Sequence, residues 1–440
     1  MQTAAVGRVC AVLFGVGLLT GCGPSGGSQQ VVVLHENVAD VRERVNELRE
    51  QVAELIAHRE VATCRLPNRT SEVYINPGSG FPINPARIPA SGNVNVAVLF
   101  VDFPDAPAPQ GEAATADEQN LTQEIFENII PDAEKYLEAM SYWTLDLTFR
   151  PLHRWLRMPH NVSSFYGDTD SNRGMSISRS RLVEDAIGLA DPEFDFEDID
   201  SVVVIAAPGA DSIKRVLAHG WSFNADGQTI ENSISLRYGD PYWAGGMAGG
   251  MIAHELGHNL GLPDLYDKHV GFDFYSDSDS EFILPYEVLR FVGAFGIMGG
   301  YGEFSINEMF AWSRWRLGWL RDTQVACITS FPASVWLTPL AIPGGRKAVV
   351  VPLTETTAVV VESRRKLGYD SLLRKEGALV YKVDTSVQSG EGPIVVGSFS
   401  GRTPDSSVIL GPRGVWNWEG YSVTVKEVTP EGDLVEITAQ

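Results

Sequence analysis

The segment at residues 251–264, MIAHELGHNLGLPD, constrains the fold of this chain more than any other stretch. His254 and His258 stand four residues apart, so in an α-helix their imidazoles lie on one face and can reach one ion. Gly261 can adopt the left-handed conformation that ends a helix and turns the chain back. We therefore expect a helix that carries both histidines, followed by a turn that brings Asp264 to the same ion as a third ligand.

Glu255 gives this arrangement the character of a catalytic site rather than a structural one. Zinc lowers the pKa of a bound water to about 7, and a carboxylate beside the ion can take the proton that the water loses. Structural zinc sites usually close with four protein ligands and favour cysteine, whereas three protein ligands leave a position open. We therefore predict one catalytic Zn²⁺ with Glu255 as general base. Asp267 and His269 are alternatives to Asp264 as the third ligand.

The first 22 residues have the pattern of an export signal. Arg8 precedes an apolar run at residues 9–19, which suits a signal peptide and is too short to span a membrane. The sequence LTGC that ends at Cys22 resembles the lipobox of bacterial lipoproteins, in which the signal is cut before the cysteine and the cysteine is acylated. An ordinary secretory signal is the alternative. We expect residues 1–21 to be a lipoprotein signal peptide, and Cys22 to anchor the protein at the bacterial cell surface or in the periplasm.

Three segments are expected between the lipid anchor and the first strand. Residues 22–36 are interpreted as a tether, because they begin with a stretch rich in glycine and serine. Residues 37–60 are predicted to form an amphipathic, coiled-coil-like helix with one apolar seam, made of Val38, Val41, Val45, Leu48, Val52 and Leu55. The seam favours a stalk or a helix on the catalytic domain, since self-association usually needs about three or four heptads. Residues 61–90 are interpreted as a linker or pro-segment.

Residues 91–325 mix strands with helices. Nearly continuous apolar runs, such as residues 93–103, indicate strands that are covered on both faces. The alternating segment at residues 232–238 favours an edge strand beside a cleft, where an extended peptide could add as a further strand. The remaining expected strands are residues 145–155 and 201–207, and the expected helices are residues 121–139, interrupted at Pro131, and residues 180–190, 246–260 and 307–317.

The pattern changes near Gln324, after which short β-rich runs alternate with proline and glycine. No helical period occurs there, so residues 326–440 are expected to form an all-β sandwich. The expected strands are residues 335–340, 347–353, 358–363, 378–383, 394–399, 421–428 and 434–438. The predicted fold class is therefore α+β, with a mixed sheet and an active-site helix followed by a β-sandwich domain.

Two of the four cysteines are expected in the folded protein. Cys10 leaves with the signal and Cys22 is committed to lipid, which leaves Cys64 and Cys327. Outside the cytosol, two remaining cysteines most often form a disulfide. The alternative is that the Cys64 thiolate occupies the zinc in a latent form, since thiolate is a good zinc ligand.

Several stretches resemble one family. HELGHNLGLPDLYD is similar to the HExxHxxGxxD signature of the immune inhibitor A family of secreted bacterial metallopeptidases. Other stretches resemble that family in the same order: NVAVLFVDFPD, AEKYLEAMSYWTLDLTFR, SVVVIAAPGA, FGIMGGYGEFSINEMFAWSRWRLGWL and VVVESRRKLGYDSLLRKEGALVYKVD. The resemblance implies a metzincin-like zinc peptidase domain at residues 91–325, with Met298 in a turn beneath the zinc. Tyr301, three residues on, is one of several residues that could stabilise the oxyanion.

One departure from the family concerns calcium. Relatives often carry a longer Asp/Gly-rich loop near residues 195–200, whereas this chain runs directly into the next strand. The chain offers oxygen ligands of the kind that Ca²⁺ prefers at Asp273, Asp277, Asp279 and Glu281, so a calcium ion is possible. A solvated acidic loop is the commoner explanation of such a cluster.

The net charge of −22 argues against a nucleic-acid partner, because an acidic surface repels a phosphate backbone. The expected partners are protein or peptide substrates and a membrane, reached through the lipid anchor. Two other functions share parts of the pattern. A non-catalytic surface binding protein would keep zinc for stability only, and Glu255 argues against it. A zinc amidase acting on cell-wall peptides would use the same chemistry on another substrate.

Overall fold

The computed structural model describes residues 27–70, 77–108, 114–165, 172–213, 217–239, 248–270, 287–300, 307–397 and 403–440. The chain divides into two compact units, Met1–Leu55 and Ile56–Gln440. The predicted signal peptide, Cys22 and Tyr301 lie outside the described residues. The same holds for the candidate calcium ligands, which are Asp273, Asp277, Asp279 and Glu281.

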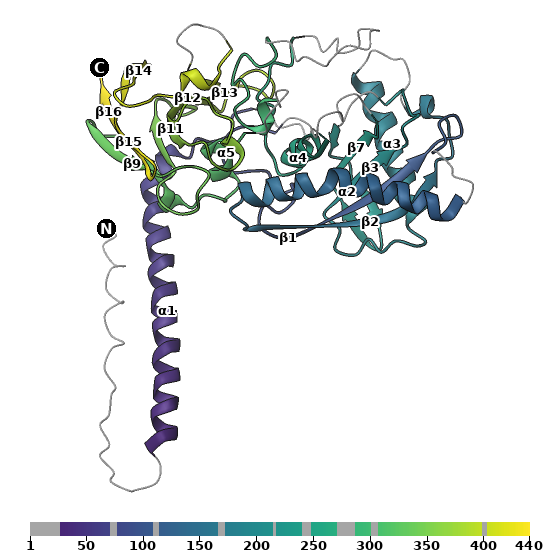
Figure 1. Cartoon of the computed structure of the whole chain (residues 1–440), viewed down its shortest axis with the longest axis horizontal. Coiled ribbons are helices and arrows are strands. Elements are labelled where there is room, and N and C mark those ends of the chain that lie inside the picture. The colour runs from purple at the N-terminus through teal and green to yellow at the C-terminus, as the bar shows by residue number, and fades with distance from the viewer. Residues whose placement is uncertain are drawn as a thin grey trace, which may run out of the picture. The chain divides into compact units, whose positions relative to one another are not determined.

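One continuous helix, α1 (Gly27–Val61), contains the residues of the predicted apolar seam (Figure 1). It begins earlier than the predicted helix of residues 37–60, so the predicted tether is wrong for residues 27–36, which are helical. From Ser28 to the end of α1 the sequence has neither glycine nor proline, and extending a helix is far easier than nucleating one. Among the described residues, no helix has the length and apolar character needed to cross a membrane.

A five-stranded sheet with the order β2-β1-β3-β7-β4 forms the framework before the candidate site. Four of its strands run parallel, and β4 is antiparallel to β7, so the sheet is mixed as predicted. Val98 on β1 pairs with Pro151 on β2 and with Val203 on β3. The strands are β1 (Gly92–Asp102), β2 (Leu145–Arg157), β3 (Ser201–Ala206), β4 (Leu217–His219) and β7 (Ser233–Arg237), and β5 (Phe223–Ala225) and β6 (Gln228–Ile230) form a separate hairpin.

The prediction of an edge strand at residues 232–238 is wrong, because β7 lies inside the sheet between β3 and β4. Its first four residues are buried. The alternation that suggested an exposed edge comes from two small serines, Ser233 and Ser235, which are both buried. Ser235 Oγ lies 2.8 Å from Nε2 of His219. The edge of the sheet on this side is β4, a three-residue strand, and β2 is the other edge.

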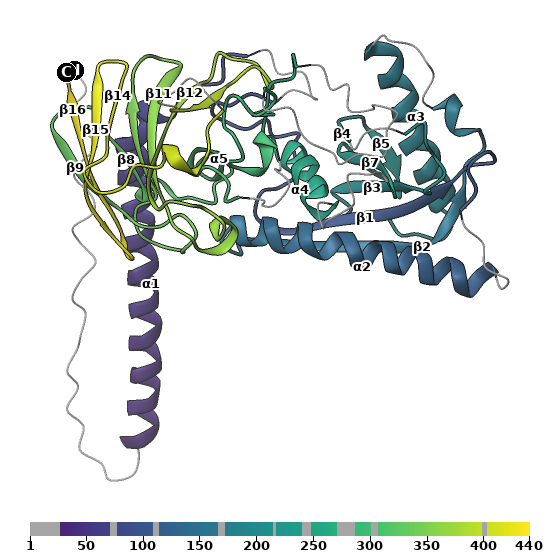
Figure 2. The same cartoon turned by 45° about the horizontal axis from the view of Figure 1, so that its top comes forward.

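The central strand β1 packs on both faces, as its continuous apolar run predicted. Val94, Val96 and Val98 belong to the hydrophobic cluster that includes α2 (Ala114–Met140) and α4 (Ala248–Asn259). The alternate residues, Ala97, Leu99 and Val101, belong to the cluster that includes α3 (Asn172–Ala190). Since side chains on a strand alternate between faces, α2 and α4 cover one face of the sheet and α3 covers the other (Figure 2).

Helix α2 runs without interruption through Pro131, so the predicted break is wrong. A proline inside a helix costs roughly 3 kcal/mol, because it removes one hydrogen bond and crowds the preceding turn. Here Ile125, Ile129, Ala133 and Leu137 are all buried in the core. Burial of one side chain of this kind contributes about 1.5–3 kcal/mol, so packing along this face outweighs the proline.

The C-terminal part contains two sheets whose strands are mostly antiparallel, with the orders β13-β12-β11-β10-β8 and β14-β15-β16-β9. Valines and leucines from both sheets form one hydrophobic cluster between them. The strands β8 and β14 were missed in the sequence because they are short. The strands are β8 (Val325–Cys327), β9 (Ala333–Leu337), β10 (Ala348–Pro352), β11 (Thr357–Arg364), β12 (Gly377–Asp384), β13 (Ile394–Val396), β14 (Val415–Trp418), β15 (Tyr421–Thr429) and β16 (Gly432–Ala439).

The hydrophobic core continues across the predicted boundary between residues 325 and 326. Helix α5 (Ala311–Arg316), shorter than the helix predicted at residues 307–317, packs against the first C-terminal sheet. Its Ala311 amide donates a 2.7 Å hydrogen bond to the buried Glu362 carboxylate on β11. The strand pattern changes at the predicted boundary, but the two parts share one core and belong to one compact unit.

The described residues of the predicted linker, 61–70 and 77–90, are part of this folded unit, which corrects the interpretation as a linker. Leu66, Phe81 and Ile88 are buried in the main core. Cys64 forms a disulfide with Cys327, as predicted from their export and number. The alternative, a Cys64 thiolate on the metal, is excluded by that bond. In residues 61–70 and 77–90, the prolines, glycines and asparagines belong to an irregular backbone that packs against the core.

Candidate metal centre

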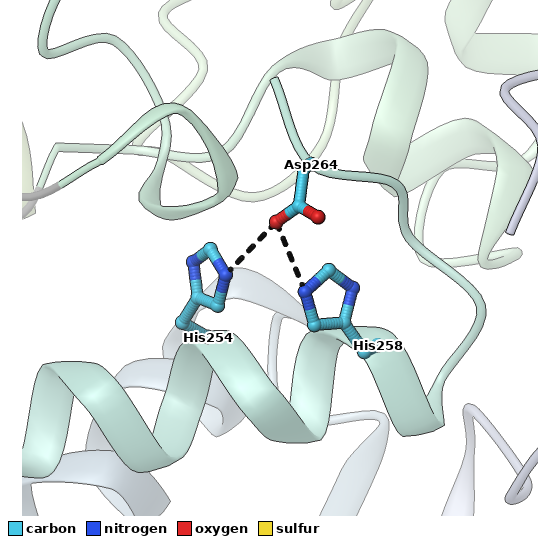
Figure 3. Close-up of side chains that lie close together, drawn as sticks. All are labelled: His254, His258 and Asp264. Atoms are coloured by element: carbon cyan, nitrogen blue, oxygen red, sulfur yellow. Dashed lines mark ion pairs between the residues drawn. The ribbon is translucent and has the colours of Figure 1, made fainter. Parts of the chain in front are cut away.

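Helix α4 presents the two motif histidines side by side. His254 and His258 lie on successive turns and face the loop that follows the helix (Figure 3). Their ring centroids are 4.8 Å apart, with the rings nearly perpendicular. The side chains are 8% and 12% exposed, so both imidazoles are largely buried.

Backbone carbonyls fix which nitrogen of each ring faces the site. Nδ1 of His254 lies 3.0 Å from the carbonyl oxygen of Ile297, and Nδ1 of His258 lies 2.8 Å from that of Leu262. A carbonyl oxygen can only accept, so each Nδ1 carries the hydrogen and donates it. In the neutral rings both Nε2 atoms then offer a lone pair, as is usual for metal-binding histidines.

Asp264 brings a third lone pair to the same point. Its Oδ1 lies 3.3 Å from Nε2 of His254 and 3.1 Å from Nε2 of His258 (Figure 3). With both imidazoles neutral and their hydrogens on Nδ1, this buried oxygen has no hydrogen-bond donor among the described residues. Buried carboxylate oxygens are normally paired, so the arrangement calls for a cation. Two imidazoles and a carboxylate are a typical ligand set for catalytic Zn²⁺, and the residues therefore fit the predicted ion.

The electrostatics show how strongly these groups need a positive charge between them. Burial alone would lower the pKa of His258, but the Asp264 carboxylate outweighs burial and raises this pKa to about 9. For Asp264, burial opposes ionisation, yet His258 and His254 together hold its pKa well below the usual range. Without a metal, a proton therefore takes the place of the cation.

The turn after α4 forms as the sequence predicted. Gly261 has a φ of +99°, and the amide of Leu262 donates a 2.8 Å hydrogen bond to the carbonyl of Gly257. A Cβ at Gly261 would lie 2.7 Å from Cγ2 of Ile83, so glycine is required by both backbone and space. This turn reverses the chain and directs Asp264 back over the helix.

Met298 lies in a short 3₁₀ turn, η4 (Ile297–Gly299), against the same helix. A Cβ on Gly257 would come within 2.6 Å of the Met298 sulfur, so the glycine between the histidines lets the methionine approach α4 closely. The carbonyl of Met298 accepts a 2.8 Å hydrogen bond from the amide of Leu265. With the Ile297 carbonyl on His254, this turn supports both the helix and the segment that carries Asp264.

Glu255 is buried beside the histidines and is held by the edge strand. The amide of Ala218 on β4 donates a 2.6 Å hydrogen bond to Oε2 of Glu255. Burial raises the pKa of Glu255, and the two neighbouring histidines and this hydrogen bond oppose the rise. A carboxylate whose pKa is moved toward neutrality is suited to accept and return a proton.

The two alternative third ligands are engaged elsewhere. Asp267 is buried, with Oδ2 2.7 Å from Nε of Arg290. The side chain of His269 is 65% exposed and lies 3.5 Å from the carboxylate of Glu391. Within the described ranges, the only group of histidine, cysteine and acidic side chains close enough to hold an ion is His254, His258 and Asp264.

Two contacts of the site had no signal in the sequence. The backbone amide of Ala218 contacts the candidate base, and Ser389 contacts Asp264 from a loop 125 residues further along the chain. Any residue except proline has a backbone amide, so the residue type does not reveal a backbone donor. The sequence Ser-Gly-Glu-Gly around Ser389 is typical of a surface loop. Only the tertiary structure shows them.

Comparison with known proteins does not assign the chain to a family. No protein-family model matches the chain, and no curated protein matches it significantly. The likeness to immune inhibitor A peptidases therefore remains a resemblance of motifs. What the structure itself defines is the kind of site: a buried site with two histidines, one aspartate and an adjacent glutamate.

Proposed function

We propose that the protein is a zinc-dependent endopeptidase that hydrolyses peptide bonds of extracellular proteins. One observation carries the proposal. Among the described residues, no group donates to the buried Oδ1 of Asp264 when the histidines are neutral, and it lies 3.1 and 3.3 Å from two imidazole nitrogens whose other ring nitrogens are already engaged. A divalent cation satisfies all three, and the ligand set suits zinc.

The chemistry then divides between the ion and the chain. Bound zinc would act as a Lewis acid that polarises the scissile carbonyl and acidifies water. Glu255 is placed to accept a proton from the attacking water as the C–O bond forms. It returns that proton to the leaving nitrogen as the C–N bond breaks. The Ala218 amide keeps one oxygen of Glu255 fixed, which leaves the other for the water.

The position of strand β4 favours an extended peptide as the substrate over a folded protein surface. Among the described residues, strand β4 has β7 on one side and no strand on the other, and it lies beside Glu255. An extended peptide would pair with that side of β4 through groups other than the Ala218 amide, which is already bonded to Glu255. The proposal extends to a metzincin-like catalytic domain followed by a β-sandwich domain. It also includes a lipid anchor at Cys22, which would place the enzyme at the bacterial surface or in the periplasm.

Zinc content and proteolysis test the proposal together. Protein lacking residues 1–26, which precede the described part, should bind about one zinc per chain. It should cleave a reduced, carboxymethylated protein, lose this activity to a chelator and regain it with zinc. Protein without bound zinc, or cleavage that survives the chelator, would contradict the proposal.

The cell-wall amidase is the second candidate, because the same ligands and base serve any amide. A panel that contains an unfolded protein and purified cell-wall peptides separates the two. Cleavage of cell-wall peptides with the unfolded protein left intact would favour the amidase. A zinc-binding protein that cleaves neither, and whose stability drops when zinc is removed, would favour the non-catalytic binding protein.

A further inference from the structure

Two loops that are distant in the sequence hold each other beside the candidate metal centre. One is the segment after the α4 turn, and the other connects β12 to β13 at residues 385–393. The amide of Gly390 donates a 2.9 Å hydrogen bond to the carbonyl of Asp264, and the amide of Lys268 donates a 3.0 Å hydrogen bond to the carbonyl of Gly390. The backbone of the third ligand is therefore fastened to the C-terminal sheets.

The hydroxyl of Ser389 adds contacts that bear on the ligand itself. The amide of Asp264 donates to Ser389 Oγ at 2.9 Å, and Ser389 Oγ donates to Asp264 Oδ2 at 3.3 Å. Ser389 is 2% exposed, so water cannot readily replace its hydroxyl. Since Oδ2 is occupied in this way, Oδ1 is the oxygen that faces the two histidines.

We propose that Ser389 is a positioning residue of the metal centre, which orients the Asp264 carboxylate so that Oδ1 serves as the third ligand. The inference rests on the proposed zinc function. Partners that orient a ligand typically change metal affinity by about 10- to 100-fold when removed. The C-terminal sheets thus contribute to metal binding through this loop, although they supply no ligand among the described residues.

The close approach of the two loops depends on Gly390. Its φ is +72°, and a Cβ there would lie 2.9 Å from Cβ of Lys268. The Lys268 ammonium lies 3.1 Å from the Ser389 carbonyl and 3.0 Å from the Glu391 carboxylate. These outer contacts are partly exposed and contribute little by themselves, so the buried Ser389 hydroxyl is the contact to test.

Zinc affinity tests the role directly, without any measurement of activity. The dissociation constant is measured by competition with a chromophoric chelator for the protein lacking residues 1–26 and for its Ser389→Ala variant. We expect about 10- to 100-fold weaker binding for Ser389→Ala. The matched control is Ser386→Ala, since this exposed serine lies in the same loop but contacts Asp384 instead. It should bind zinc as tightly as the parent protein.

A pair of isosteric variants covers the case in which Ser389→Ala folds poorly. Ser389→Thr keeps the hydroxyl and Ser389→Val removes it at nearly the same shape, so threonine should bind zinc about tenfold or more tightly than valine. Equal affinities for parent and Ser389→Ala, or for threonine and valine, would overturn the positioning role. A parent protein that binds no zinc would instead overturn the proposed function, so the two failures are distinguishable.

Discussion

The backbone amide of Ala218 donates a 2.6 Å hydrogen bond to Oε2 of Glu255, which ties the edge strand of the sheet to the candidate general base. Strand β4 and the carboxylate that would act on a substrate are thereby fixed to one another. A peptide held on β4 would keep a constant distance from the base. This relationship leads to the first two predictions.

Replacing Glu255 by glutamine should abolish cleavage and leave zinc binding intact. Glutamine keeps an oxygen for the Ala218 amide but cannot take a proton. Loss of a general base typically lowers the rate by about 10²- to 10⁴-fold. The measurement is kcat/KM together with zinc content per chain. Unchanged cleavage would show that the mechanism is wrong.

Removing the Ala218 donor should change the pH profile. Burial raises the pKa of Glu255, and the Ala218 hydrogen bond opposes that rise because it favours the charged carboxylate. In Ala218→Pro the donor is absent, so the pKa of Glu255 should rise further. The base is active only when deprotonated, so the acid limb of kcat/KM should move to higher pH. Zinc content and circular dichroism serve as controls, and an acid limb that stays in place refutes the assignment.

Zinc affinity should weaken as the pH is lowered from about 9. In the metal-free site the pKa of His258 is raised to about 9, so below that pH zinc must displace a proton. Each pH unit between about 9 and 7 should then raise the dissociation constant roughly tenfold. Competition titrations at several pH values measure this slope. A constant affinity over the range would mean that no ligand proton is displaced.

Gly261→Ala should destabilise the protein more than Gly227→Ala. Both glycines have a positive φ, but a Cβ at Gly261 meets Ile83 at 2.7 Å, whereas a Cβ at Gly227 meets nothing within 4 Å. Backbone strain alone should cost about 1 kcal/mol at Gly227, and the clash adds to it at Gly261. Urea unfolding of metal-free protein measures the difference. Equal losses would show that the Ile83 contact relaxes without cost.

Protein that begins at Ser91 should be much less stable than protein that begins at Ile56. The shorter form lacks Leu66, Phe81 and Ile88, which are all buried. Each such side chain contributes about 1.5–3 kcal/mol, and the loss of the Cys64–Cys327 disulfide adds to the difference. Thermal unfolding compares the two forms. Equal stability would restore the interpretation of residues 61–90 as a linker.

Much of the fold followed from local patterns. The apolar run of β1 predicted a strand covered on both faces, and the short β-rich runs predicted the C-terminal sheets. The predictions were wrong where packing between distant segments determines the local structure. Packing along one face carries α2 through Pro131, and the serines of β7 are buried instead of lining an edge. Neither context is visible in a window of neighbouring residues.

The candidate site divides in the same way. The sequence alone determined that His254 and His258 lie on one face of a helix with Glu255 beside them, and that Gly261 reverses the chain, because helix period and backbone freedom are local properties. The tertiary structure alone decided that Asp264, and not Asp267, reaches the histidines. It also decided which strand holds Glu255 and that Ser389, 125 residues away, orients Asp264. These are contacts between distant segments, and they form only when the sheets, the helix and the loops pack around one core.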